Sequence, residues 1–383
     1  MDFALSAQHA EIRRTVRDFA EREIAPVADE MERSGEFPAE IIRKAAGIGL
    51  LGVPFPEKVG GTGLDSLAYA ITIEELSRVS GSVGIIVSAH TSLGCAPLYL
   101  GGTPEQKERY LRPLASGAKL GAYGLTEPGA GSDSRGTRTR ARREGDEWVL
   151  SGTKRFITNA GVADTYIVTA LTDDHAESGR ISAFIVEAGT PGFSIGRMEE
   201  KMGLHASQTG ELIFEGCRVP ADNLLGRAGE GDRLFLETLD GGRIGIGAMA
   251  LGLAQAAYEA AAAYATQREQ FGRTIASFQG VAFKIADMAT QIDAARMMVY
   301  RAAWLKDRGE PYTTEAAMAK LFASETARQV TNDAVQVHGG YGYVAEYRVE
   351  RYLRDAKLTE IGEGTSEIQR LVIARNLLGV RAM

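Results

Sequence analysis

Apolar residues recur at helical spacing through the first third of the chain. Ile12, Val16 and Phe19 fall on one face of a helix that Pro26 should end. An N-terminal α-helical domain is therefore predicted over residues 1–120. The same spacing, introduced by proline, by serine or by a T-P-E-Q capping box, predicts further helices within it at residues 38–49, 66–76 and 103–117.

The pattern changes at Gly121 from helical spacing to alternation. Short runs rich in β-branched and aromatic residues follow, and Glu144-Gly145-Asp146 is a plausible hairpin turn between two of them. Strands this short and evenly spaced indicate a small β-barrel or sandwich, which we assign to residues 121–228. The expected strands are residues 122–126, 139–143, 148–151, 166–171, 181–186, 193–195, 212–214 and 217–219.

Helical spacing returns after Gly229 and persists to a final stop at Gly379. Long helices joined by brief turns are typical of an antiparallel four-helix bundle, which we predict for residues 229–383. The fold class is therefore α+β, with helical domains on both sides of a central β domain. The four bundle helices are expected at residues 234–268, 278–308, 314–338 and 366–378.

Length and charge narrow the possible partners. A chain of 383 residues exceeds what one core usually organises. A formal net charge of -7 gives no general attraction to nucleic acid or to an anionic membrane, so neither is expected as a partner. The most apolar stretch, residues 245–265, is interrupted by Gln255 and Glu259 and is interpreted as a buried helix rather than a membrane span.

Cysteine usage and the N-terminus indicate a cytoplasmic protein. The two cysteines, Cys95 and Cys217, are far apart in apolar settings, which favours a reducing compartment and buried thiols. Residues 1–14 lack the basic start, apolar run and cleavage site of a signal peptide. The histidines show no metal-ligand spacing, so no metal site is predicted.

The strongest candidate for chemistry is the carboxylate of Glu363, which stands between two glycines. It immediately precedes a helix that Thr365 or Ser366 should cap, with Gln369 closing an S-x-x-Q capping box. Flanking glycines allow a ligand to approach closely and permit φ > 0. This arrangement suits a base that reaches a bound molecule, although a plain helix start with an acid near its N-terminus has the same pattern.

Three glycine-containing turns leave backbone groups open to a ligand. The turn at 123–133 follows a strand and is rich in free donors and hydroxyls, the turn at 156–161 adds an aromatic ring, and the turn at 336–342 ends a helix. None is a G-x-G-x-x-G sequence that opens a helix, so a βαβ dinucleotide site is not supported. The small, apolar stretch 80–100 either lines a pocket or packs as a core helix.

Together these segments resemble the acyl-CoA dehydrogenase family, and the resemblance covers nearly the whole chain. The sequence L-D-G-G-R-I-G-I at 239–246 is most similar to the short-chain, butyryl-type branch. Five ordered motifs carry the resemblance: TEPGAGSD at 126–133, FITN at 156–159, R-x-x-F-G at 268–272 with the following Phe278-Gln279, QVHGGYGY at 336–343, and RDAK at 354–357 followed by EGTSEIQR at 363–370.

The resemblance implies a flavoprotein that binds FAD and forms a homotetramer, a dimer of dimers. Such enzymes remove the α and β hydrogens of an acyl-CoA thioester, which gives the trans-2-enoyl-CoA, and pass electrons to electron-transferring flavoprotein. Glu363 resembles the family's α-proton base, while the β-hydrogen leaves as hydride to flavin N5. The backbone N–H of Glu363 and a flavin ribityl hydroxyl would hold the thioester carbonyl. We expect burial to raise the pKa of Glu363 more than the helix N-terminus lowers it.

The resemblance also assigns residues to the cofactor and to the substrate, in part from a neighbouring subunit. For the substrate it implies Ser132, Asp240, Arg243 and Gly364. For FAD it implies Tyr123, Leu125, Thr126, Gly131, Ser132, Phe156, Ile157, Thr158, Arg268, Phe271, Gln279, Gln336, Val337, Gly339, Gly340, Thr365 and Glu367.

Three positions depart from the family pattern. Gly242 stands where isovaleryl-type relatives carry their base, which leaves Glu363 as the candidate. Gly362 replaces a tyrosine found in many relatives, which suggests a wider pocket that admits branched or cyclic acyl groups. His205 stands where relatives usually have arginine, with no physical account from sequence.

Alternative functions follow from the same residues. An acyl-CoA oxidase shares the fold but usually has a much longer chain, and an acyl group on a carrier protein is compatible with the sequence. A non-catalytic DNA-binding relative is supported only by an arginine run, which at strand spacing is better explained as a solvated β surface. That run is Arg135, Arg138, Arg140, Arg142 and Arg143.

Overall fold

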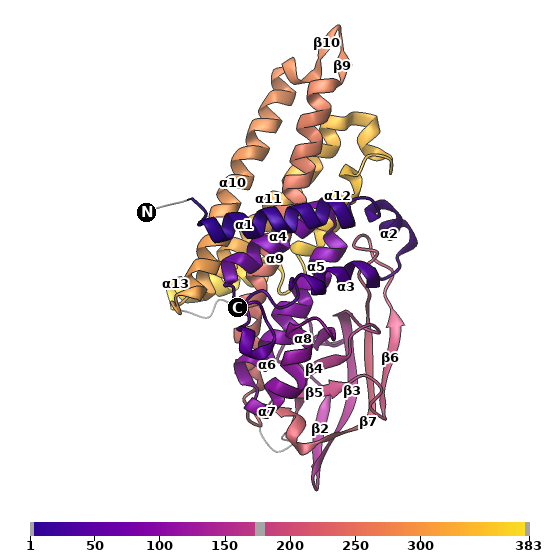
Figure 1. The fold of residues 1–383 in the computed structure, drawn as a ribbon, viewed down its shortest axis with the longest axis vertical. Helices are drawn as coiled ribbons and strands as arrows, with labels where there is room; N and C mark the ends of the chain where they lie inside the picture. Colours follow the sequence, from indigo (N-terminus) through magenta and orange to yellow (C-terminus); the bar gives the residue numbers. More distant parts are fainter. Residues whose placement is uncertain (1–3, 173–180, 380–383) are drawn as a thin grey trace.

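The computed structural model describes residues 4–172 and 181–379, and it confirms the predicted α+β organisation. Helices occupy both ends of the chain and a sheet the middle (Figure 1). The N-terminal part comprises α1 (Ala7–Phe19), α2 (Ala28–Ser34), α3 (Ala39–Gly47), α4 (Ser66–Val79), α5 (Gly81–Ala89), α6 (Ala96–Gly101), α7 (Pro104–Gln106) and α8 (Arg112–Ala115), with π-helical turns η1 (Ala20–Ile24), η3 (His90–Cys95) and η4 (Lys107–Leu111) and the 3₁₀ turn η2 (Glu57–Val59).

Helix starts in this part follow the predicted chemistry with one exception. The Thr103 capping box forms as expected before α7. Asp65, not Ser66, caps α4, because its carboxylate accepts from the N–H of Ala68 at 2.8 Å and Ser66 is already the first helical residue.

The central strands form one hydrogen-bonded sheet in the order β6-β7-β3-β2-β4-β5-β8, with β1 parallel to β4. The predicted hairpin at Gly145 joins β2 to β3. The two strands expected at 212–214 and 217–219 are a single strand, since a bulge at Gly216 lets one strand continue past it. The strands are β1 (Gly121–Gly124), β2 (Arg140–Glu144), β3 (Glu147–Thr158), β4 (Thr165–Leu171), β5 (Ile181–Glu187), β6 (Phe193–Met198), β7 (Thr209–Pro220) and β8 (Leu224–Leu225), with the 3₁₀ turn η5 (Ala221–Asn223) before β8.

The C-terminal part has the four predicted long helices close to their expected bounds and one helix more, α12. Helix α12 was missed because it is short and rich in charged residues, and its apolar face is narrow. It packs against α9 and α11, whereas α13 packs against α11. The elements are α9 (Gly231–Gln267), β9 (Glu269–Gln270), β10 (Arg273–Thr274), α10 (Gln279–Asp307), α11 (Thr313–His338), α12 (Val349–Thr359) and α13 (Ser366–Leu378), with 3₁₀ turns η6 (Ile275–Ser277) and η7 (Gly339–Tyr343).

One hydrophobic core runs through both helical parts. Helix α4 packs against α9 and α10, α5 packs against α9, and α1 packs against α4, and residues of all these helices share one core with α11. A second core fills the sheet, and a third joins the sheet to α6, α8 and α9. The first and last thirds of the chain bury their apolar faces in one core. The domain limits at residues 120 and 228 therefore stay predictions.

Helices α9 and α10 extend beyond the N-terminal helices (Figure 1). In Figure 1 they rise together to the β9–β10 hairpin at the top of the molecule, while β2, β3 and β7 lie at the opposite end. We call residues 268–279 and 336–344 the tip.

Candidate active site

Glu363 lies on a tight turn between α12 and α13. Its own backbone is in the left-handed region, at φ +53°, and Gly364 follows at φ +94°. Gly362 does not adopt a positive φ, so only one of the two glycines is needed for the backbone path. A glutamate in this conformation is strained, and such strain persists where the surroundings impose it.

The turn is held by side chains from two helices. Thr365 is the N-cap of α13, and its Oγ1 accepts from the N–H of Ile368 at 3.3 Å. The predicted S-x-x-Q capping box does not form. Instead Gln369, fully buried, donates from Nε2 to the carbonyl oxygens of Glu363 at 3.3 Å and Gly364 at 2.9 Å. Lys320 of α11 donates to the same Gly364 oxygen at 2.7 Å.

The Glu363 carboxylate lies against Gly242 of α9. A methyl group built at Gly242 would be 1.8 Å from Oε2 of Glu363, so only glycine leaves room for the acid. The residue as a whole is half-buried, but both carboxylate oxygens are inaccessible to solvent and have no hydrogen-bond partner. A buried, unpartnered carboxylate is costly and indicates a group completed by a ligand.

Burial raises the pKa of Glu363 to about 7, and the cations of Lys320 and Arg243 act against that rise. This agrees with the expectation that burial would dominate. A carboxylic acid with a pKa near neutrality can accept a proton at physiological pH and release it afterwards.

Two buried hydroxyl groups lie against α9 near this acid. The Tyr69 hydroxyl of α4 is 3.0 Å from Ser88 Oγ of α5. A methyl group at Gly245 would be 2.4 Å from the first oxygen and 2.5 Å from the second, so the pair rests on α9 one turn beyond Gly242. Burial raises the pKa of Tyr69, and the charge of Glu363 adds to this, so the phenol stays protonated. Sequence reasoning flagged residues 80–100 as a possible pocket lining but missed Tyr69.

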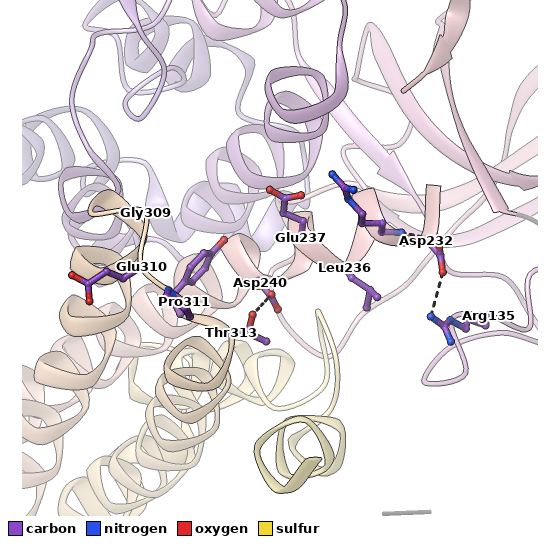
Figure 2. A pocket seen from close by; sticks show the side chains of 11 residues that line it. Arg135, Asp232, Leu236, Glu237, Asp240, Gly309, Glu310, Pro311 and Thr313 are labelled. Carbon is purple, nitrogen blue, oxygen red and sulfur yellow. Dashed lines mark hydrogen bonds and ion pairs between the residues drawn. The ribbon is translucent and has the colours of Figure 1, made fainter. Parts of the chain in front are cut away.

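Asp240 and Arg243 form an ion pair, and only Asp240 reaches open space. Thr313 Oγ1 donates to the other oxygen of Asp240, while Arg243 is buried. Figure 2 shows the cavity of about 630 Å³ beside them, between the start of α9 and the α10–α11 loop. Its lining includes Arg135, Asp232, Glu237, Asp240, Tyr312 and Thr313.

The first group of predicted cofactor residues gathers where β1 and β3 end. The N–H of Arg155 donates to the Thr126 carbonyl oxygen at 2.8 Å, which brings Thr126 beside the segment 156–158. Phe156 has φ +58° and is 58% exposed, with the Arg155 guanidinium 5.1 Å from its ring centre. Around it, Tyr123 and Ile157 are buried, Leu125 and Thr158 are half-buried, and Gly131 and Ser132 are exposed.

The second group lies at the tip. Phe271 is 93% exposed at φ +54°, and the Arg268 guanidinium lies 5.4 Å from the Tyr341 ring centre. Gly339 and Gly340 are exposed with nothing near their α-carbons. Gln279 and Gln336 are exposed, Val337 is buried, and Thr365 and Glu367 lie with Glu363 instead.

One chain therefore does not assemble all predicted cofactor residues. Strands β3 and β4, the latter paired with β1, lie in the lower half of Figure 1, whereas the tip is at its top. Both groups nevertheless fit a bound dinucleotide: each offers exposed aromatic surface, open backbone and an arginine beside a ring. The structure shows nothing else in the described residues that would cover Phe156 or Phe271.

The other sequence expectations have simpler outcomes. His205 tethers its loop to α2, since its ring nitrogens contact the carbonyl oxygens of Glu32 at 3.2 Å and Lys201 at 3.0 Å, and it does not line the cavity. The arginine run is exposed: Arg135 pairs with Asp232 and Arg142 with Glu144. In the described part of the chain, no cluster of three or more His, Cys, Asp or Glu residues could hold a metal ion.

Two helical stretches are long and apolar enough to cross a membrane. Among the described residues they are 81–101 and 231–267, and 78% of the apolar 18-residue window in each is buried inside the protein. Helices that form the core of a soluble protein pass the same test, so the finding is weak evidence for a span.

Three family models cover the chain in order. They are the N-terminal domain of acyl-CoA dehydrogenase at residues 6–118, the middle domain at 122–217 and the C-terminal domain at 229–378. A short-chain-specific acyl-CoA dehydrogenase of Clostridium acetobutylicum is 52% identical over 98% of this chain and 99% of its own.

Solved structures are also similar to nearly the whole chain. Butyryl-CoA dehydrogenase of Megasphaera elsdenii has a TM-score of 0.97 at 48% identity, covering 99% of this chain and 100% of that one. A chain from a study of the electron-transferring flavoprotein of Acidaminococcus fermentans also has a TM-score of 0.97, at 51% identity, with 99% and 100% covered. An acyl-CoA dehydrogenase of Bacillus anthracis in complex with FAD has a TM-score of 0.93 at 39% identity, with 98% and 67% covered.

Proposed function

This chain belongs to the acyl-CoA dehydrogenase family, and from that premise we propose that it uses FAD to dehydrogenate a short acyl-CoA thioester to the trans-2-enoyl-CoA, with Glu363 as the α-proton base. The observation that carries this proposal is the Glu363 carboxylate, buried against Gly242 with neither oxygen partnered and with a pKa raised by burial to about 7. Bound FAD would supply the acceptor for the β-hydride.

The chain's own residues account for the proton-transfer half of the reaction. The ionised carboxylate of Glu363 takes the α-proton of the thioester, and protonation relieves the cost of its buried charge. The N–H of Glu363 serves as a donor to the thioester oxygen as negative charge develops there. The strained backbone at φ +53° supports this role, because it is held in place by Gln369 and Lys320 before any ligand binds.

The flavin ring, the substrate and the rest of FAD are assigned to three groups of residues, and Ser132 belongs to both of the first two. Thr126, Phe156 and Thr158 would hold the flavin ring at the ends of β1 and β3. Ser132, Gly364 and the cavity beside Asp240 would receive the CoA thioester, with Arg243 holding Asp240 from below. The tip residues Arg268, Phe271, Gln279, Gln336, Val337, Gly339 and Gly340, together with Thr365 and Glu367, would bind the remainder of FAD in a homotetramer built as a dimer of dimers.

Several finer assignments complete the proposal. Electron-transferring flavoprotein is the proposed electron acceptor and the cytoplasm the proposed location, since bacterial relatives match along the whole chain. Gly362 is proposed to widen the pocket for branched acyl groups. A methyl group at that position would contact only Leu358, at 3.5 Å or more, so the space beside it is open.

Anaerobic mixing of the purified holoprotein with butyryl-CoA tests the proposal. Flavin absorbance should bleach in the wild type and in Glu350→Gln, a control on α12 whose carboxylate pairs with Arg354. In Glu363→Gln, bleaching should slow by about 10²–10⁴-fold while FAD stays bound. Undiminished reduction in that variant would show that the base lies elsewhere.

A further inference from the structure

Lys320 is a buried cation next to the turn that carries Glu363. It lies on α11 among buried alanines, is 0% exposed, and donates from Nζ to the Gly364 carbonyl oxygen at 2.7 Å. A buried ammonium group is costly unless its charge is compensated. A lysine in this position therefore requires an explanation beyond helix packing.

No carboxylate of the described residues lies within 4.0 Å of the Lys320 ammonium group. Its electrostatic neighbours are Glu363, which has the largest effect, then the cation Arg243, then Glu360 and Glu367. Glu360 is already paired with Arg328 and Lys357. Glu363 is thus the main compensating charge for Lys320.

Lys320 is in turn the charged group with the largest effect on Glu363. The charged groups that act on it are Lys320 of α11 and Arg243 of α9, while Tyr69 of α4 faces it as a neutral phenol. Arg243 is occupied by Asp240 in a close ion pair. Lys320 remains as the cation whose charge no contacting carboxylate neutralises.

We propose that Lys320 is a positioning residue for the base: its ammonium group fixes the Gly364 peptide and stabilises the ionised carboxylate of Glu363 through space. This inference rests on the proposed role of Glu363. Lys320 acts through the turn, by its bond to the Gly364 oxygen, and through its charge. It keeps Glu363 ionised, and so able to accept a proton, at a pH where burial alone would leave it protonated.

The pH window is consistent with this role. Burial lowers the pKa of Lys320 to about 8 and raises the pKa of Glu363 to about 7, so the ammonium persists while the carboxylate ionises. If the charge of Lys320 is removed, one of the two cations that oppose the effect of burial is lost. The pKa of Glu363 then rises further. An opposite charge within about 4–6 Å typically shifts a carboxyl pKa by about one unit or more.

Proton transfer alone should be measured in the holoprotein with a 3-thia analogue of butyryl-CoA. Its α-hydrogens can exchange with solvent deuterium, but sulfur at the β-position prevents hydride loss. Mass spectrometry of the recovered analogue therefore measures the rate of proton removal by the base, without flavin reduction. The exchange rate should rise with pH through about 7 in the wild type, following the Glu363 pKa.

Lys320→Met and Lys320→Gln should both move this midpoint upward by about one pH unit or more, because both remove the charge. Gln retains a donor for the Gly364 oxygen, and Lys320→Arg retains the charge, so Arg should stay near the wild-type midpoint. Lys201→Met is the control: Lys201 is a half-buried lysine whose Nζ likewise donates to a backbone carbonyl, of Ser207, at 2.7 Å, but it is not among the charged groups that act on Glu363.

An unchanged midpoint in both Met and Gln variants overturns the proposal. If Met shifts the midpoint but Gln does not, the charge has no role and the proposal also fails. Absence of exchange in the wild type itself would instead contradict the function proposed for Glu363, so the two failures are distinguishable.

Discussion

The turn that carries Glu363 and the tip differ in which groups they leave without a partner. On the turn, a carboxylate is buried with both oxygens unpartnered. At the tip, large aromatic rings are exposed, with Phe271 93% and Tyr343 88% accessible. Unpaired polar atoms inside a protein indicate a missing polar ligand, whereas exposed aromatic surface indicates a missing apolar partner. We infer that substrate completes the first region and that cofactor with a second copy of the chain completes the second.

The largest expected effect is the recovery of activity when two inactive variants are co-expressed. Glu363→Gln keeps the tip, and Arg268→Ala keeps the base, so each homo-oligomer should be nearly inactive. If one site takes its base from one chain and its tip from a neighbour, co-expressed chains should recover about a quarter of the wild-type sites by random pairing. Butyryl-CoA dehydrogenase activity of the purified hybrid, compared with the two parents mixed after folding, measures this. If the hybrid recovers no activity, each chain builds its site alone.

Gly242→Ala should damage the pocket and spare the tip. The new methyl group would lie 1.8 Å from Glu363 Oε2, so the acid must move, and displacement of a catalytic group by about 1 Å can cost about 10²-fold in rate. Gly241→Ala is the control, because its methyl group would meet only the flexible end of Lys306 at 3.0 Å. Steady-state kinetics and FAD content check both. Equal activity in the two variants would refute the packing of Glu363 against α9.

Glu363→Gln should stabilise the holoprotein at high pH. Folding raises the pKa of Glu363 from 4.5 to about 7, so the folded state favours the protonated acid. The stability that this contributes is complete below pH 4.5 and is lost as pH rises through 7. Glutamine at this position avoids this loss of folding stability, which is on the order of 3 kcal/mol at pH 8. Melting curves from pH 5 to 8 should show a gap between variant and wild type that widens with pH, and a constant gap would contradict the buried charge.

Gly362→Tyr should have the smallest effect. Space beside Gly362 accepts a side chain, so folding and FAD binding should persist while the acyl pocket narrows. We expect kcat/KM for isobutyryl-CoA to fall about 10-fold relative to butyryl-CoA, as expected for a change of one to two kcal/mol in pocket contacts. Rejection of every branched acyl-CoA by the wild type would contradict the wider pocket before any mutation is made.

The sequence predicted the fold where local patterns determine it. Helical spacing in the first and last thirds, alternation after Gly121 and the Thr103 capping box all correspond to observed elements. It failed where long-range contacts decide: α12 is stabilised by packing on α9 and α11, and the bulge at Gly216 joins two predicted strands into one.

The same division applies to the site. Motifs identified Glu363 and the turn that carries it, and the comparisons with relatives confirm the family. Tyr69 and Lys320 were missed because they come from helices far away in sequence, although a lysine among the alanines of α11 was a usable signal. Gln369 was assigned to a capping box but holds the carbonyls of Glu363 and Gly364, a choice that depends on the strained backbone at Glu363.

The pH dependence of kcat/KM for butyryl-CoA in the wild-type holoprotein tests the central claim most directly. Burial raises the pKa of Glu363 to about 7, so the account predicts that kcat/KM rises with pH through about 7, and that the residual activity of Glu363→Gln does not follow this curve. A wild-type profile that is flat from about pH 5 to 8, or an identical rise in Glu363→Gln, would contradict the assignment of Glu363 as the base.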